Sequence, residues 1–180
     1  MELDEIIELT RNCDAVLIPV GTPVYIPAGT MVRLVQRLGG SYTVSVNANL
    51  VRIAGKDADA LGFEVEQPDL PPAPSEGVVS QEALYGVLRT CFDPEIPVNI
   101  VDLGLVYRLE IEPVEGGSRV TIYMTLTAPG CGMGPFIVDD VRQKVVAVPG
   151  VREAFVDLVF DPPWDRSMMS DLARLQLGFF

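Results

Sequence analysis

The sequence predicts an α+β protein with two domains, a small all-β domain followed by a two-layer domain of helices packed on a sheet. The chain of 180 residues is 48% apolar, which is enough to bury a core in each domain. Four prolines fall within residues 68–74, and such a run favours an extended spacer because proline lacks the backbone N–H and fixes φ. We therefore expect domains at residues 1–66 and 79–180, joined by a proline-rich linker at 67–78.

The first domain shows the pattern of a small β barrel or sandwich. Short stretches rich in β-branched residues are separated by glycines and asparagines. Tyr42, Val44 and Val46 alternate with polar residues, as in a strand that is buried on one face. A helix from Asp4 to Asn12 is expected to precede the strands. The expected strands cover residues 15–19, 22–26, 31–36, 42–46 and 50–53.

The second domain mixes helices and strands in the order α-β-β-α-β-α. Ser80 is suited to cap the first helix, in which apolar residues recur at helical spacing up to Cys91. Two alternating stretches flank Gly116-Gly117 and predict a hairpin. A second helix is expected over residues 134–146, with Pro135 in its first turn. Val156, Leu158 and Phe160 mark a third strand, and Met168, Leu172, Leu175 and Phe179 are spaced for a closing helix.

Composition excludes several classes of function. The 13 basic and 25 acidic side chains give a net charge of −12, which argues against a nucleic-acid partner. The absence of histidine excludes Ser-His-Asp and Cys-His catalysis within one chain, and any site that needs imidazole ligands. No apolar run approaches the roughly 20 residues of a membrane helix, and the acidic start does not resemble a signal peptide. We expect a cytoplasmic protein whose three cysteines are reduced thiols.

The strongest candidate for chemistry is the segment Thr127-Ala-Pro-Gly-Cys131-Gly-Met-Gly-Pro135. It lies between the end of a predicted strand and the start of a predicted helix, and glycines surround Cys131. Glycines allow backbone angles closed to other residues and let a bulky ligand approach the main chain. Amide groups at a helix N-terminus stabilise anions, which favours the thiolate, the form that acts as nucleophile and soft-metal ligand. Cys131 is therefore placed where a sulfur ligand to iron would be placed.

A structural role is the alternative for each cysteine. Cys131 would then be a small apolar residue that fills a tight glycine turn. Cys91 falls on the apolar stripe of the first helix, which favours core packing. Cys13 follows Asn12 near the end of the expected N-terminal helix, and nothing in the surrounding sequence forms a site.

A second candidate segment precedes the first strand of the hairpin and contains Asp93, Glu95, Asn99 and Asp102. Spacing alone is explained by ordinary turn chemistry, in which Asp and Asn side chains bond to nearby backbone groups. The Cys131 turn follows the second strand of the same hairpin. Antiparallel pairing is expected to bring Asp102 beside Thr127.

Four motifs together resemble those of a known family. They are Asp93-Pro-Glu95, Asp102-Leu-Gly-Leu-Val-Tyr107, Thr125-Leu-Thr-Ala-Pro-Gly-Cys-Gly-Met-Gly134 and Val159-Phe-Asp-Pro-Pro-Trp164. In this order they resemble the iron–sulfur assembly domain of SufT-type proteins, which also occurs in PaaD and at the front of Mrp-type ATP-binding cluster carriers. The resemblance spans about residues 80–175. Residues 20–62 are similar to the extra N-terminal part that distinguishes SufT.

The resemblance implies a factor that helps to mature iron–sulfur proteins and is not itself an enzyme. The family's reactive cysteine carries over to Cys131 as the metal ligand, and its polar neighbours carry over to Asp93, Glu95, Asp102 and Thr127. The implied cargo is an iron–sulfur cluster, bound transiently and passed to client apoproteins, with assembly scaffold or carrier proteins as partners. PaaD-type relatives have further metal-binding cysteines near the C-terminus, and none follows Cys131 here.

A single candidate ligand thiol per chain, Cys131, also predicts an oligomer. Iron–sulfur clusters usually have four thiolate ligands, so we expect a homodimer in which two chains present Cys131 across an interface, with a small thiol or a partner completing the shell. Two other functions remain open. The chain could be a metal-free adaptor that docks clients onto the assembly machinery. It could also be a thiol enzyme, which the missing histidine disfavours. No membrane partner is expected.

Overall fold

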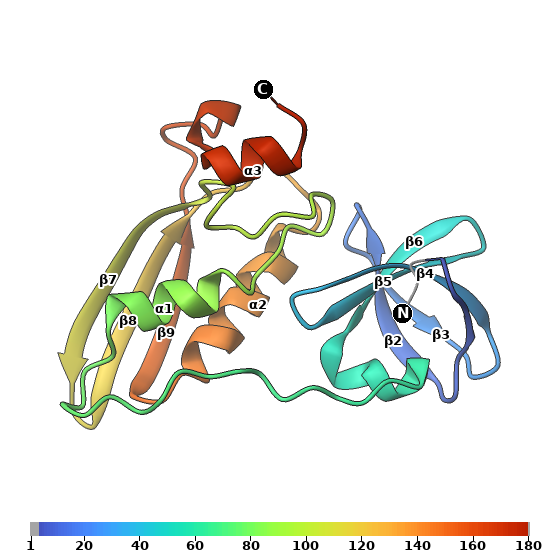
Figure 1. The fold of residues 1–180 in the computed structure, drawn as a ribbon, viewed down its shortest axis with the longest axis horizontal. Helices are drawn as coiled ribbons and strands as arrows, with labels where there is room; N and C mark the ends of the chain where they lie inside the picture. Colours follow the sequence, from blue (N-terminus) through green and yellow to red (C-terminus); the bar gives the residue numbers. More distant parts are fainter. Residues whose placement is uncertain (1–3, 180) are drawn as a thin grey trace. The chain divides into compact units, whose positions relative to one another are not determined.

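The structure, a computed structural model, describes residues 4–179 and contains two compact units that divide between Pro68 and Asp69 (Figure 1). The first unit is all β, and the second mixes helices with a sheet. The predicted fold class, an all-β region followed by an α+β region, is confirmed at this level. Residues 63–79 form turns and extended chain without a helix or strand.

The front unit is built on one antiparallel sheet of six strands, in the order β1-β4-β5-β6-β2-β3. Because β1 and β3 are its free edges, residues 4–68 show neither the two stacked sheets of a sandwich nor a barrel closed by strand pairing. A short 3-10 helix, η1 (Gly55–Leu61), follows the last strand. The strands are β1 (Ile6–Glu8), β2 (Cys13–Ile18), β3 (Pro23–Ile26), β4 (Met31–Leu38), β5 (Ser41–Val46) and β6 (Asn49–Ala54).

The expectation of a helix from Asp4 to Asn12 is wrong, because this segment contains strand β1. Ile7 of β1 pairs with Val32 of β4, so the neighbouring strand satisfies its backbone groups. Exposed Ile6 and Glu8 alternate with half-buried Ile7, which is the period of a strand. Tertiary pairing thus decided the conformation of a segment whose local pattern was short and ambiguous.

The turn between β5 and β6 stores backbone strain. Val46 pairs with Asn49, and the two residues between them, Asn47 and Ala48, have φ of 49° and 64°. A two-residue hairpin turn with two positive φ values has the type I′ form, which favours Asn followed by Gly. Ala48 therefore occupies a position where its Cβ is unfavourable.

Ala48→Gly is expected to raise the free energy of unfolding of the front unit by about 1 kcal/mol. The gain arises because glycine adopts the left-handed conformation without a Cβ clash, and it exceeds the entropy that glycine loses on folding. Urea unfolding measures it. An Ala48→Gly variant less stable than the parent would show that the turn is not strained at this residue.

The second unit is a three-stranded sheet with helices on one face. The sheet order is β7-β8-β9, with β7 and β8 antiparallel and β9 parallel to β8 (Figure 1). Val120, Ile122 and Met124 of β8 point into the core, and Val141 and Val145 of the second helix pack in the same cluster. The elements are α1 (Gln81–Leu88), β7 (Val106–Val114), β8 (Gly117–Met124), α2 (Gly134–Val146), β9 (Val151–Leu158), η2 (Arg166–Met168) and α3 (Asp171–Gln176).

The start of each long helix follows from its sequence. The Ser80 side chain accepts a hydrogen bond of 3.1 Å from the N–H of Ala83, so it caps α1 as its residue type predicts. The first turn of α2 contains Pro135, whose missing N–H is tolerated there. The N-terminus of α2 has no side-chain cap.

The closing helix differs from its predicted form. Only residues Asp171–Gln176 are α-helical, and the apolar stripe of Leu172 and Leu175 is 56% and 61% exposed. The buried side of α3 instead holds Ala173. The small side chain of Ala173 allows α3 to pack closely on the core of the second unit. Leu172 and Leu175 lie on the opposite, exposed side of the helix.

Candidate functional site

Three segments lie at one end of the β7-β8-β9 sheet. Strand β7 begins where β8 ends, because Val106 pairs with Met124, and β9 ends at the same edge, where Leu158 pairs with Met124. The loop before β7, the turn after β8 and the chain after β9 therefore share this end (Figure 1). The N–H of Thr125 donates a hydrogen bond of 2.8 Å to the C=O of Leu105, which joins the first two segments directly.

The turn around Cys131 leads into α2. Gly130 has φ of 75°, a left-handed conformation that glycine adopts without strain. The C=O of Cys131 accepts a hydrogen bond of 3.0 Å from the N–H of Gly134, and a Cβ on Gly134 would lie 2.8 Å from Leu126 Cδ1. Cys131 is half-buried and packs on the margin of the core. Cys131 is therefore the one of the three cysteines that is not fully buried.

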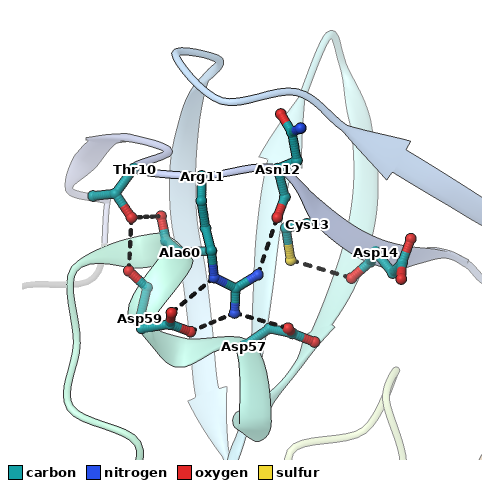
Figure 2. A network of polar contacts seen from close by, with 8 residues as sticks. All are labelled: Thr10, Arg11, Asn12, Cys13, Asp14, Asp57, Asp59 and Ala60. Atoms are coloured by element: carbon teal, nitrogen blue, oxygen red, sulfur yellow. Dashed lines mark hydrogen bonds and ion pairs between the residues drawn. The ribbon is translucent and has the colours of Figure 1, made fainter.

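The other two cysteines are buried, with Cys13 2% and Cys91 1% exposed. Cys91 packs in the core of the second unit. Cys13 is an inward-facing residue at the start of β2 and lies beside the network in Figure 2, in which Arg11 binds Asp57 and Asp59. Burial, and then the nearby Asp57 carboxylate, raise the pKa of the Cys13 thiol to about 11. Cys13 is therefore a neutral thiol near pH 7.

Asp93 is a buried carboxylate that organises the start of the loop. It is 4% exposed, and its Oδ1 accepts hydrogen bonds of 2.9 Å from the N–H of Glu95 and 3.2 Å from the N–H of Ile96. Burial raises the pKa of the Asp93 carboxyl, and the two backbone hydrogen bonds oppose that shift. Burial thus makes ionisation of Asp93 less favourable than it is in water.

Asn99 and Asp102 form the second half of the loop. Asn99 Oδ1 accepts hydrogen bonds from the N–H groups of Val101 and Asp102, at 3.1 and 2.9 Å. Asn99 Nδ2 donates to Asp102 Oδ2 at 2.6 Å. The side chains of Asp93 and Asn99 therefore do take part in ordinary turn chemistry, which is the alternative that the sequence left open.

The predicted site residues lie in the loop before β7 and in the turn after β8, and they do not form a closed ligand shell. Glu95 is exposed and Thr127 is half-buried. Across residues 4–179, no group of three or more cysteine, aspartate or glutamate side chains is placed to hold a metal ion. The donor set in these two segments is one half-buried cysteine and several carboxylates. A cluster held here would need ligands from another molecule.

Thr125 is a polar residue that sequence reasoning did not single out. Its side chain is fully buried, and its Oγ1 has no hydrogen-bond partner within the described chain. Ile122 and Met124 face the core, so strict alternation would place Thr125 on the opposite face. No sequence signal could therefore have predicted its burial.

Asp93→Asn is expected to stabilise the second unit at neutral pH. Asparagine keeps the oxygen that accepts from Glu95 and Ile96, and it removes the buried charge. Because folding raises the pKa of Asp93, wild-type stability falls as pH rises from the unfolded to the folded pKa. The advantage of the variant should therefore vanish near pH 3–4 and reach its full size well above the folded pKa. Thermal unfolding across pH measures it, and an advantage that grows on acidification would contradict this account.

Comparison with known proteins shows what the second unit is similar to. Residues 81–157 match the family described as iron–sulfur cluster assembly protein. A Fe-S protein maturation auxiliary factor of Porphyromonas gingivalis is 48% identical over 105 residues, which cover 58% of this chain and 97% of that protein. The Fe-S protein maturation auxiliary factor SufT of Staphylococcus aureus is 43% identical over 86 residues, 48% of this chain and 94% of that protein.

A solved structure shows the same fold for the second unit. The crystal structure of a domain of unknown function, DUF59, from Bacillus anthracis has a TM-score of 0.51 and 39% sequence identity. The matched region covers 56% of this chain and 92% of the Bacillus anthracis chain. Other relatives are named iron–sulfur cluster carrier proteins.

These similarities define a protein of the iron–sulfur assembly class. The chain belongs to the iron–sulfur cluster assembly protein family, and its relatives include proteins named as SufT-type maturation factors.

The SufT of Staphylococcus aureus is matched along 94% of its length by only 86 residues of this chain. That protein is therefore too short to contain a counterpart of the whole front unit. The similarity of residues 20–62 to a SufT extension stays a prediction. None of the helices in residues 4–179 is long and apolar enough to cross a membrane.

Proposed function

We propose that this protein is an iron–sulfur maturation factor that holds a cluster transiently through Cys131 and passes it to client apoproteins. The supporting observation is the half-buried Cys131 on a glycine turn before the uncapped N-terminus of α2. Helix N-termini favour negative charge, and both a thiolate and an iron–sulfur cluster with thiolate ligands are anionic. The names of the relatives support the same class of function.

An incomplete ligand shell suits transfer. A cluster with four thiolates from one chain would be retained, whereas a cluster bound by one thiol per chain can exchange its remaining ligands. We propose that a second copy of the chain, a small thiol or a partner protein supplies those ligands. A homodimer with two Cys131 side chains facing each other is the simplest arrangement.

The loop before β7, which contains Asp93, Glu95 and Asp102, is proposed to contact the iron together with Cys131. Oxygen atoms around the cluster would come from three of the four predicted polar neighbours, the exposed Glu95 and the half-buried Asp102 and Thr127. Buried Asp93 would act mainly by shaping the loop. In this proposal the protein works in the cytoplasm with scaffold or carrier proteins and clients, and it catalyses no reaction of its own.

Anaerobic reconstitution tests the proposal. The whole chain should take up iron and sulfide in equal amounts, show visible absorption typical of a cluster, and restore the activity of an apo acceptor enzyme. A chain that takes up neither iron nor sulfide, with or without a small thiol, would contradict it.

The metal-free adaptor is the second candidate, favoured by the lack of a closed metal site in residues 4–179. It predicts that a chain with serine at residue 131 matures clients in cells as well as the wild type. Failure of that variant to mature clients would count against the adaptor.

A further inference from the structure

The chain after β9 forms a strap over the loop before β7. We define the C-terminal strap as residues 159–179, which lie beyond the family match at residues 81–157. The N–H of Val159 still donates to the C=O of Met124 at 2.8 Å, as a continuation of the sheet. The strap then contacts the loop that contains Asp102, at the end of the sheet where the Cys131 turn also begins (Figure 1).

Hydrogen bonds join the strap to this loop. Trp164 Nε1–H donates to the C=O of Leu103 at 2.8 Å, and the N–H of Ser170 donates to the C=O of Asp102 at 2.8 Å. The Tyr107 hydroxyl donates to the C=O of Pro162 at 2.7 Å. The first two bonds satisfy consecutive carbonyl groups of the loop, and Leu103 is fully buried. Without the strap, these carbonyls would lose their partners.

The strap and the loop approach each other so closely at Gly104 that no side chain would fit there. The φ of Gly104 is 75°, and a Cβ placed there would lie 2.2 Å from the carbonyl oxygen of Met168. The obstacle is backbone, so no side-chain rotation relieves it. Most apolar side chains of α3 face outward, and Met169 and Ala173 are the buried anchors of the strap. The strap is therefore held by polar contacts and a close backbone approach in addition to its apolar contacts with the core.

We propose that the C-terminal strap is a positioning element of the cluster site, with Trp164 and Ser170 as its positioning residues. It fixes the backbone of Asp102 and Leu103, and thereby sets the orientation of the Asp102 carboxylate at the end of the sheet where the Cys131 turn begins. This inference rests on the proposed function. It adds that the segment after β9 controls the geometry of the exchange site.

Docking of the strap can be measured without any cluster. Trp164 is the only tryptophan of the chain, so its fluorescence reports the environment of the strap. In Gly104→Ala we expect emission at longer wavelength and at least tenfold faster proteolysis after residue 158, with unchanged far-ultraviolet circular dichroism. Gly86→Ala is the matched control, because a Cβ at Gly86 meets nothing within 4 Å and should change none of these signals. Wild-type emission and proteolysis in Gly104→Ala would overturn the proposal.

Cluster transfer then tests positioning. Gly104→Ala, and Trp164→Phe as a milder variant that keeps an apolar ring, should lower the rate of transfer to an apo acceptor at least tenfold. Asp102→Asn should have a similar effect, and adding it to Gly104→Ala should lower the rate no further.

The outcomes of the two proposals can be told apart. A wild type that takes up no iron defeats the proposed function. A loaded wild type and a Gly104→Ala variant that transfer at equal rates defeat the positioning role of the strap. Independent, multiplicative effects of Gly104→Ala and Asp102→Asn would also defeat it.

Discussion

Cys131→Ser is expected to lower the iron and sulfide content of the reconstituted protein at least tenfold. Serine has nearly the size of cysteine and keeps a polar side chain, so the turn should fold as before. It replaces a soft sulfur ligand by a hydroxyl, which binds iron of a cluster poorly. Iron and sulfide analysis with the visible spectrum measures the effect.

The chain offers a matched control for this variant. Cys13→Ala removes a thiol that is 2% exposed and lies in the front unit, so it should leave the iron content at the wild-type level. Equal iron, equal sulfide and the same spectrum in Cys131→Ser and the wild type would reject Cys131 as a ligand.

Gly55→Ala is expected to unfold the front unit and leave the second unit folded. A Cβ at Gly55 would lie 2.0 Å from the carbonyl oxygen of Gly40, a backbone atom that cannot move without shifting the turn between β4 and β5. The cost should be about 3 kcal/mol or more. That is comparable with the whole stability of a domain of this size, about 3–10 kcal/mol.

Calorimetry of the full chain measures this effect. The unfolding transition of the front unit should disappear or shift to much lower temperature, and that of the second unit should persist, because we propose that residues 67–78 are a linker between independently folding domains. Gly86→Ala, in the second unit, should change neither transition appreciably. Loss of both transitions in Gly55→Ala would contradict independent folding.

Much of the fold could be predicted because local signals agreed with tertiary packing. Ser80 and Pro135 mark the starts of α1 and α2, and the structure has both helices at those residues. Glycine pairs and alternating apolar residues located the β7-β8 hairpin for the same reason. The segment from Ile6 to Glu8 was mispredicted because its strand depends on pairing with β4. The paired residues are distant in sequence, as in Ile7 and Val32, which are 25 residues apart.

The site could be predicted in part. The position of Cys131 after β8 and before α2 followed from motif and periodicity. Its half-burial, and the burial of Asp93 and Thr125, depend on how loops close over the core, which single-sequence patterns do not encode. The contact of Trp164 with Leu103 joins residues 61 apart, and the tight approach at Gly104 appears only once the strap is folded back.

The most direct test of the central role of Cys131 is its rate of alkylation before and after anaerobic loading with iron and sulfide. Cys131 is half-buried while Cys13 and Cys91 are buried, so mass spectrometry of native protein should find alkylation at Cys131 first. We predict that loading slows alkylation of Cys131 at least tenfold and that an iron chelator restores the original rate. An equal rate in loaded and unloaded protein would show that the Cys131 sulfur does not bind the cluster.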